Sequence, residues 1–339
     1  MMSRCVVATS IAPRNIELQQ SSISNWQSLG FEVISINSAS EIEVVQSSFS
    51  TVKFVTADRT AEAATGKPYI YFDDVCMALA ETGADICGII NSDIQLVQCT
   101  DFKDVVTREA KGGFLFGSRI DVGEQKDTDG EIYFVGFDFF FLDRSVLSCY
   151  PPSEFCLGAP WWDYWAPVVP LVKGIPCKEL ISPVAFHLKH ETKWAPDLFY
   201  RFGHIIAEEL KALSDSVPLA QALNGEILEG DVNRDFNIFS FVVLQFILNG
   251  AEPIIFDRSQ NDSKLVHIGT QQFGSMRRQL IEQSRVCWCL SRENERLRVA
   301  LEAVNFEVER DKKHFNDFQS SLSWRITAPL RKILDALRR

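Results

Sequence analysis

The sequence predicts an α/β protein with a mostly parallel sheet and helices on both faces, followed by a helical extension and a long C-terminal helix. β-Branched runs alternate with amphipathic helical patterns over roughly the first 190 residues. The apolar run of residues 85–91, DICGIIN, is typical of a strand buried on both faces. Residues 276–319 contain neither Gly nor Pro and are dense in charge, which indicates one long helix.

The first part of the chain alternates regularly between the two patterns. Gly30 and Gly83 are predicted helix stops, and Ser40 with the acidic Glu41 and Glu43 is a predicted helix start. The predicted strands are 4–11, 31–37, 52–57 and 85–91, and the predicted helices are 15–29, 40–49 and 69–82.

After residue 91 the pattern changes. Predicted strands are 113–121, 131–142, 183–190 and 253–257, and predicted helices are 161–172, 197–213 and 237–248. We therefore expect four parts: a catalytic-type α/β domain over 1–213, a mainly helical extension over 214–275, a long helix over 276–319, and a separate amphipathic segment over 320–339. Leu290, Leu297, Leu301, Val304 and Val308 recur at roughly heptad spacing, so the long helix is predicted to form a coiled coil that joins copies of the chain.

Charge is unevenly distributed along the 339 residues. The net charge of −11 combines an acidic body with a basic C-terminal end. An acidic body argues against nucleic acid as its partner, whereas a basic end favours an anionic partner. The nine cysteines form no Cys-x-x-Cys pair, which argues against a zinc ribbon and a thioredoxin-like site and favours a reducing, cytoplasmic compartment. The longest apolar stretch, 236–248, is too short to span a bilayer.

The common nucleotide-binding and nucleophile motifs are absent, since no Walker A loop, no G-x-G-x-x-G after a strand and no G-x-S-x-G occurs. Polar residues instead follow the buried strand 85–91, as Asn91, Ser92 and Asp93. Ligands of open α/β sheets bind at the carboxyl ends of the strands, where a carboxylate can hold a divalent cation. The alternative is that Asp93 caps the next turn.

Two further acidic residues lie among aromatic residues. Asp138 interrupts the run EIYFVGFDFFFLDR, so it must be paired, metal-bound or directed into a pocket. Asp163 lies at a predicted helix start in LGAPWWDYW, where burial would raise its pKa and suit it to general-base chemistry. A helix N-terminal Asp beside a Trp-rich core is the competing interpretation.

His187 and His190 lie three residues apart in FHLKHETKW. On a regular strand this spacing directs them to opposite faces, so one of them would point inward and could complete a metal site. An exposed pair of histidines is the alternative.

Taken in order, these motifs resemble the bacterial family-2-like glycosyltransferases of the GT-A type, over roughly residues 1–200. The resemblance implies a nucleoside-diphosphate sugar donor, a divalent cation (Mn²⁺ or Mg²⁺), and a glycan or lipid-linked glycan acceptor. It implies Asp163 as general base of an inverting reaction and Asp138 in the donor or acceptor pocket. The implied metal ligands are Asp93, His187 and His190, and the implied nucleotide-sugar contacts are Thr9, Ser10, Arg14, Asn37, Glu41, Asn91 and Ser92. The first carboxylate of the usual Asp-x-Asp motif is replaced by Asn91.

The C-terminal string SSLSWRITAPLRK resembles a segment found at the ends of bacterial cell-surface polysaccharide glycosyltransferases. Pro329 suits a helix start, after which Leu330, Ile333, Leu334 and Leu337 share one face among basic residues. This pattern predicts a helix on an anionic membrane surface at the inner face of the cytoplasmic membrane, or, alternatively, one docked on the chain's own coiled coil.

Three functions remain open from the sequence. The first is a metal-assisted glycosyltransferase of O-antigen or capsule synthesis. The second is a catalytically degenerate GT-A module that acts as a scaffold, motivated by the missing first Asp. The third is a nucleotidyltransferase, although residues 10–15, SIAPRN, lack the Gly-rich phosphate loop that such an enzyme needs after its first strand.

Overall fold

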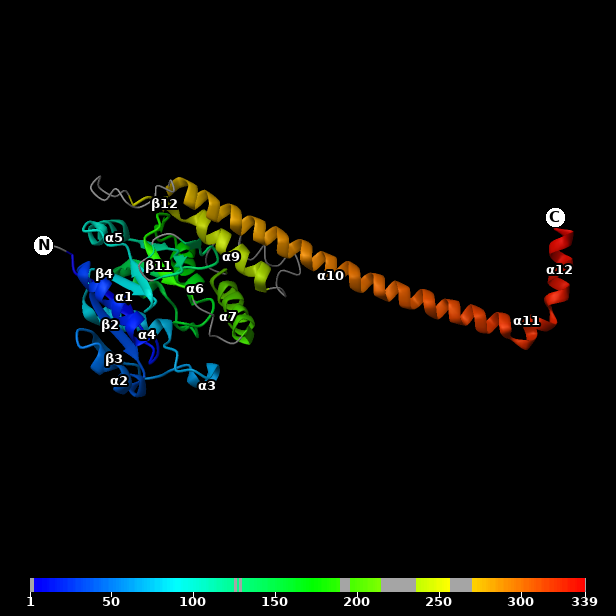
Figure 1. The fold of residues 1–339 in the computed structure, drawn as a ribbon, viewed down its shortest axis with the longest axis horizontal. Helices are drawn as coiled ribbons and strands as arrows, with labels where there is room; N and C mark the ends of the chain where they lie inside the picture. Colours follow the sequence, from blue (N-terminus) through cyan, green and yellow to red (C-terminus); the bar gives the residue numbers. More distant parts are fainter. Residues whose placement is uncertain are drawn as a thin grey trace. The chain divides into compact units, whose positions relative to one another are not determined.

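The computed structural model describes residues 3–124, 127, 130–189, 196–214, 236–256 and 270–338. The chain divides into two compact units, 1–283 and 284–339, which are described separately below. The first unit is the α/β body drawn in Figure 1. The predicted α/β class with a mostly parallel sheet and a long C-terminal helix is confirmed.

The body is organised around an eight-stranded sheet. All neighbouring strands are parallel except β9, which runs antiparallel to both of its neighbours, β4 and β6. In spatial order the strands are β12 (Glu252–Ile254), β10 (Cys177–Leu180), β6 (Phe114–Gly117), β9 (Phe139–Asp143), β4 (Ile86–Ile90), β1 (Cys5–Thr9), β2 (Glu32–Asn37) and β3 (Lys53–Thr56).

A second, four-stranded sheet follows the order β5 (Ile94–Leu96), β11 (Ala185–Leu188), β7 (Ile120–Val122) and β8 (Glu131–Ile132). The sequence did not predict this sheet as a separate unit. The predicted strand 131–142 is wrong as one element, because it divides into β8 and β9. The intervening residues 133–138 leave both ladders and line a pocket described below.

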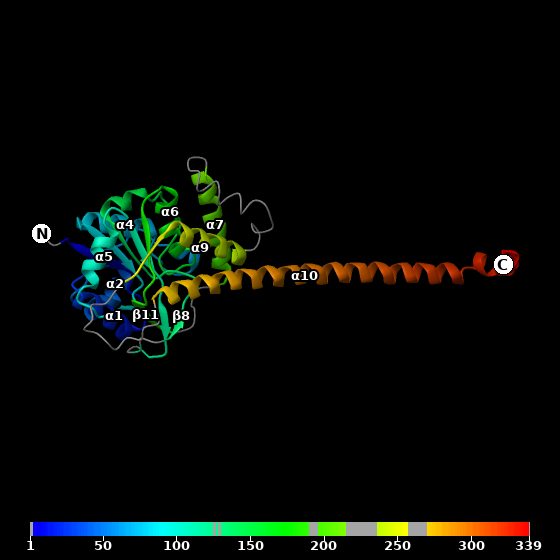
Figure 2. The same cartoon turned by 90° about the horizontal axis from the view of Figure 1, so that it is seen from above.

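Helices cover both faces of the large sheet. Alternate residues of β1 enter opposite cores: Val6 and Ala8 face one cluster, and Cys5 and Val7 face the other. Figure 2 shows α4 and α6 on one side of the strands and α1 on the other. The helices of the body are α1 (Ile16–Ser28), α2 (Ala39–Val45), α3 (Glu62–Thr65), α4 (Phe72–Thr82), α5 (Phe102–Ala110), α6 (Trp162–Val172), α7 (Pro196–Ser214) and α9 (Phe236–Gly250), with 3-10 turns at Gln46–Ser48 and Arg144–Cys149.

Local signals explain several of these boundaries. Gly83 ends α4 in the left-handed conformation, as predicted. Ser38, rather than the predicted Ser40, caps α2, because its side-chain oxygen accepts the backbone N–H of Glu41. The helix α5 and the short strand β10 were not predicted, although Phe102, Val106 and Ala110 give α5 a buried apolar face.

The long helix α10 (Thr270–Ser320) begins in the body and continues through the second unit. Its first turns pack into the body through Arg277 and Ile281, each 1% exposed. Two short helices follow, α11 (Leu322–Ile326) and α12 (Ala328–Leu337). None of the helices in the described part of the chain is long and apolar enough to cross a membrane.

Candidate active site

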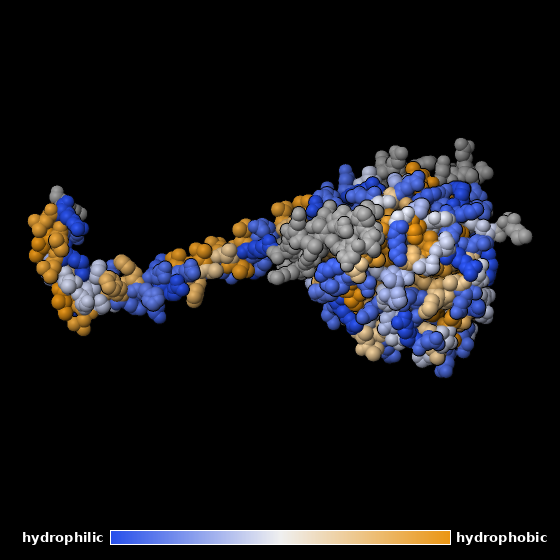
Figure 3. Space-filling model, turned by 180° about the vertical axis from the view of Figure 1, so that it is seen from behind, coloured by the Kyte–Doolittle hydropathy of each residue, from blue (hydrophilic) through white to orange (hydrophobic). Residues whose placement is uncertain are grey.

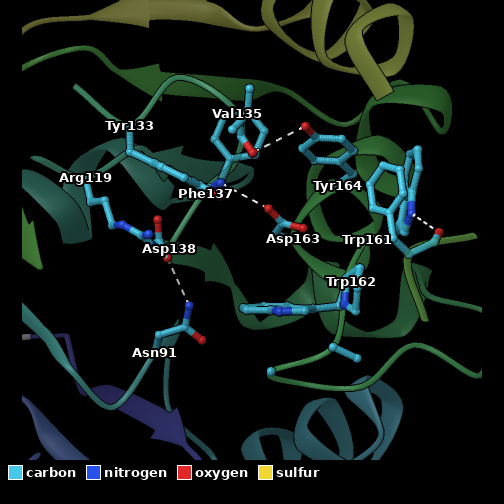
Figure 4. A pocket seen from close by; sticks show the side chains of 14 residues that line it. Asn91, Arg119, Tyr133, Val135, Phe137, Asp138, Trp161, Trp162, Asp163 and Tyr164 are labelled. Atoms are coloured by element: carbon cyan, nitrogen blue, oxygen red, sulfur yellow. Dashed lines mark hydrogen bonds and ion pairs between the residues drawn. The ribbon is translucent and has the colours of Figure 1, made fainter. Parts of the chain in front are cut away.

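A pocket of about 190 Å³ lies at the carboxyl end of β4, between the segment 133–138 and the start of α6. Figure 4 shows Asp138 and Asp163 directed toward this cavity from two different elements, with the rings of Tyr133 and Trp162 beside them. Two of the acidic residues singled out from sequence are therefore brought together. This is the edge of the sheet where open α/β folds bind ligands.

Asp163 lies in the first turn of α6 and is partly buried. Its Oδ2 accepts the backbone N–H of Phe137 at 3.3 Å. Burial raises the pKa of Asp163 to about 7, the charge of Asp138 adds to this, and the hydrogen bond from Phe137 opposes it. A carboxyl group with this pKa exchanges a proton near neutral pH, which a general base must do.

The backbone around Asp163 is shaped for this placement. Trp161, which caps α6, has a φ of 75°, a left-handed conformation that is costly for a bulky residue. Its indole N–H donates to the carbonyl of Phe199 at 2.8 Å, which holds the ring. Gly136 faces the carboxylate so closely that a Cβ there would lie 2.7 Å from Oδ2 of Asp163. A larger residue here would have to displace the Asp163 carboxylate or the Tyr133 ring.

Asp138 is 2% exposed, and its two oxygens differ. Oδ1 accepts from Nδ2 of Asn91 at 3.0 Å and from Arg119 at 2.6 Å. Oδ2 has no hydrogen-bond partner among the described residues. An unsatisfied buried carboxylate oxygen is costly, so its presence in a pocket points to a ligand that supplies a donor or a cation.

Arg119 and Tyr133 are pocket residues that sequence reasoning missed. The Arg119 guanidinium lies 3.9 Å from the centre of the Tyr133 ring and bridges Asp138 to Asp121. Burial lowers the pKa of Arg119, but the neighbouring carboxylates outweigh it and raise the pKa above its ordinary value. The charge is thus held permanently beside the cavity. The sequence around Arg119 offers no local signal, because charged residues near a polar loop are ordinary.

The small sheet assembles a second acidic group. Its register places His187 directly beside Asp121 and next to Ile94, the residue after Asp93. His187 Nδ1 lies 2.9 Å from Oδ1 of Asp121, and its Nε2 lies 3.6 Å from Oδ2 of Asp93. Burial lowers the pKa of His187, but hydrogen bonds to Asp121 and Asp93 outweigh it and raise the pKa to about 9.

Asp93 and His187 are the described residues of the three implied as ligands of a divalent cation. The described residues contain no cluster of three or more His, Cys, Asp or Glu side chains that could hold a metal ion. Asp93 and His187 nevertheless form a suitable pair, because Asp121 orients the imidazole by its Nδ1 and leaves Nε2 directed at Asp93. Once His187 is deprotonated, Asp93 Oδ2 and His187 Nε2 would give a cation two ligands, and its remaining ligands would come from phosphate oxygens. His190, the other predicted ligand, lies outside the described residues.

Three of the residues implied as nucleotide contacts, Ser10, Asn37 and Glu41, form a hydrogen-bonded network after β1 and β2. The Nδ2 of Asn37 donates to Ser10, to the carbonyl of Ile11 and to Glu41, at 2.9–3.2 Å. Thr9 is buried, and its Oγ1 has no partner within the described part of the chain. The structure thus connects Ser10, Asn37 and Glu41, and Thr9 precedes Ser10 at the end of β1.

Ser92 and Arg14 are joined to this network differently. Oγ of Ser92 donates to Oε1 of Gln19, whose amide nitrogen donates to the carbonyls of Ala12 and Arg14. Gln19, which was not predicted, therefore links the loop after β1 to the end of β4. The Arg14 side chain is exposed. Asn91 belongs with Asp138 in the pocket rather than with the residues around Asn37.

Arg277, from the first turns of α10, contacts the segment 133–138 that lines the pocket. It pairs with the buried Glu179 of β10 and lies 4.9 Å from the centre of the Phe137 ring. It also donates to the carbonyl of Gly136 at 3.1 Å, as does Ser118 at 2.8 Å. The N–H of that same peptide unit, on Phe137, donates to Asp163. One peptide group therefore connects α10 to the predicted base.

Comparisons with known proteins add little. No protein-family model matches the chain, and no curated protein matches it. Among solved structures, it is similar to a mannosyltransferase from Pyrobaculum calidifontis in complex with GDP-Man and Mn²⁺, at 12% identity and a TM-score of 0.44, covering 85% of this chain and 87% of that one. It is also similar to the inositol-1-phosphate CTP transferase of T. maritima, at 10% identity and a TM-score of 0.34, covering 60% and 96%.

Proposed function

We propose that this chain is a glycosyltransferase that moves a sugar from a nucleoside-diphosphate donor to a hydroxyl of a glycan acceptor. One observation carries the proposal: Asp163, with a pKa of about 7, shares a pocket with a buried Asp138 whose Oδ2 has no partner among the described residues. Aromatic rings line the same pocket, and such surfaces stack on sugars.

In the proposed reaction, ionised Asp163 takes the proton of an acceptor hydroxyl. The freed oxygen attacks the anomeric carbon as the bond from that carbon to the donor's diphosphate breaks, which inverts the configuration. Asp138 orients a hydroxyl of either sugar through Oδ2, and Arg119 holds its Oδ1 in place. A divalent cation, Mn²⁺ or Mg²⁺, bound by Asp93 and His187, would stabilise the charge of the leaving diphosphate.

The decisive experiment measures nucleoside-diphosphate release from a panel of nucleotide sugars with added Mn²⁺ or Mg²⁺. Asp163→Asn should lower kcat by about 10²–10⁴-fold while donor binding persists. Asp104→Asn, on the exposed face of α5, is the matched control and should retain activity. The proposal fails if no donor is bound or turned over and Asp93→Ala changes nothing.

The acceptor and the location rest on the C-terminal segment. We propose a lipid-linked glycan of cell-surface polysaccharide synthesis, reached by a protein that is cytoplasmic and peripheral on the inner membrane face. The apolar face of α12 supports this, because Leu330, Ile333, Leu334 and Leu337 are each more than half exposed. Figure 3 shows hydrophobic and hydrophilic side chains on different sides of this end of the chain.

One observation favours a scaffold as the second candidate. Asn91 stands where the resemblance expects a first carboxylate, and its amide nitrogen donates a hydrogen bond to Asp138. A degenerate module would not need the metal. Calorimetry with a nucleoside diphosphate distinguishes the two candidates, since Mn²⁺-dependent binding excludes the scaffold.

A further inference from the structure

The second unit exposes a regular apolar seam along α10. Positions a and d of successive heptads are both strongly exposed, and the seven Leu, Val and Phe residues among them are 44–61% exposed. The a positions are Cys287, Asn294, Leu301, Val308 and Phe315, and the d positions are Leu290, Leu297, Val304, Asp311 and Phe318. About four and a half heptads are sustained, enough for a stable coiled coil.

The charges that flank this seam complement a second copy of the same helix. In a parallel, in-register pair, each g position faces the e position five residues later on the partner. Glu293 would then face Arg298 of the other copy, and Glu307 would face Lys312. Within one chain Arg298 and Lys312 pair with Glu295 and Glu309 on their own helix. Exposed pairs of this kind are weak, so an exchange of partners costs little.

The seam also contains a polar position that selects one alignment. Asn294 is exposed and occupies an a position between Leu290 and Leu297. An Asn at a single a position can form a hydrogen bond with the equivalent Asn of the second chain only in a parallel dimer in register. Any other alignment buries its amide without a partner. An antiparallel pair would lose both this contact and the Glu–Arg and Glu–Lys complements.

We propose that residues 287–318 form a parallel, two-stranded, in-register coiled coil with a second copy of this chain, and that Asn294 sets its register. Asp311 is the one charged residue of the seam, and it places two carboxylates opposite each other. The Asp311 layer therefore weakens the coil locally, and Asp311→Leu should strengthen the dimer.

Sedimentation of the full-length protein tests the association. The wild type should have the mass of a dimer, and the double variant Leu297→Glu/Leu301→Glu should have half that mass. The matched control Val299→Glu/Phe306→Glu changes two exposed apolar residues at f positions, outside the seam, and should remain dimeric. A monomeric wild type, or control variants that dissociate like the seam variants, would overturn the proposal.

The native cysteines test the alignment. Cys287 is exposed at an a position and would lie opposite Cys287 of the second chain. Cys289, at a c position, would not lie opposite its equivalent. With copper phenanthroline as oxidant, the two Cys287 thiols should lose two electrons and two protons to form one disulfide. Cys287→Ser should abolish the cross-linked dimer, and Cys289→Ser should retain it. A dimer that does not cross-link through Cys287 overturns the parallel register.

Oligomer specificity gives an independent measurement. Asn294→Val should keep the chains associated but allow species larger than dimers, because the polar constraint is removed. If Asn294→Val remains purely dimeric and its cross-linking is unchanged, Asn294 does not set the register.

Discussion

At the scale of single residues, the charge of Asp138 contributes to the raised pKa of the neighbouring Asp163. Because Asp163 must be ionised to act as a base, kcat/KM should rise with pH along a limb centred near pH 7. Asp138→Asn removes a negative charge that raises the pKa of Asp163, so the limb should move down by roughly one pH unit. Steady-state pH profiles check this, and a limb that stays in place in Asp138→Asn contradicts it.

The same pKa shift has a consequence for stability. The pKa of Asp163 is about 7 in the folded protein, against about 3.9 in an unfolded chain. Between these values the folded state binds more protons, so its stability falls as pH rises. Asn cannot titrate, so the free energy of unfolding of Asp163→Asn should not fall in this way. Relative to wild type, it should be about 1–2 kcal/mol higher at pH 8 than at pH 4.5, after allowance for the partial exposure of the carboxyl. Urea unfolding at both pH values measures the gain, and an equal difference at both would refute it.

At the scale of elements, the start of α10 acts as part of the body. Arg277→Lys keeps a cation beside Glu179 but loses the bond to the carbonyl of Gly136. The N–H of that peptide should then donate more weakly to Asp163, which raises the pKa of the carboxyl and moves the acidic limb of the pH profile upward. Arg277 is thus a positioning residue.

The control for this variant is its neighbour. Arg278 also approaches Glu179, at 3.7 Å, but is 43% exposed at its side chain. Arg278→Lys should leave the limb unchanged, whereas Ser118→Ala, which removes the other donor to Gly136, should move it in the same direction as Arg277→Lys. Equal pH profiles for Arg277→Lys and Arg278→Lys would show that Arg277 only stabilises the fold.

Most large elements could be predicted from sequence because their periodicity is local. The strands 86–90 and 32–37 and the helices 16–28 and 162–172 follow from apolar patterns and stop residues. The division of 131–142 could not be predicted, because residues 133–138 are as apolar as the strands that flank them. Their separation depends on contacts with distant residues, such as Asp163 and Arg277.

The candidate site could likewise be predicted only in part. Asp138 and Asp163 could be singled out because a carboxylate buried among aromatic residues is costly unless it has a partner or a function. In the structure both residues line one pocket. Asp121 and Arg119 carried no such anomaly, since charged residues near a polar loop are ordinary. Their importance arises from the pairing of β7 with β11, a long-range register that no local pattern specifies.

At the scale of the whole molecule, the net charge of −11 conceals a basic end. Residues 320–339 carry five Lys or Arg and one Asp, next to the exposed apolar face of α12. Arg331 also stacks on Trp324, at 3.4 Å from the ring centre, and donates to Thr327, which orders the turn between α11 and α12. This segment is therefore a preformed amphipathic surface.

Deletion of residues 320–339 should abolish binding to vesicles that contain anionic lipid. Each basic residue near such a surface contributes about 1 kcal/mol, and the contribution falls with added salt. Flotation with phosphatidylglycerol vesicles measures the loss, and neutral phosphatidylcholine vesicles are the control. If the truncated protein floats as well as the full chain, α12 serves a structural role instead.

The uninterrupted run of α10 up to Ser320 has one more consequence. A parallel coil through 287–318 would end with two copies of α11 and α12 at the same end, so that one assembly carries two lipid-binding segments. The second segment would then bind at a high effective concentration, and avidity could exceed the affinity of one segment by about 10²-fold or more. The variant Leu297→Glu/Leu301→Glu retains α11 and α12 but is expected to be monomeric. It should therefore bind anionic vesicles far more weakly than the wild type, because one lipid-binding segment dissociates more readily than two linked segments.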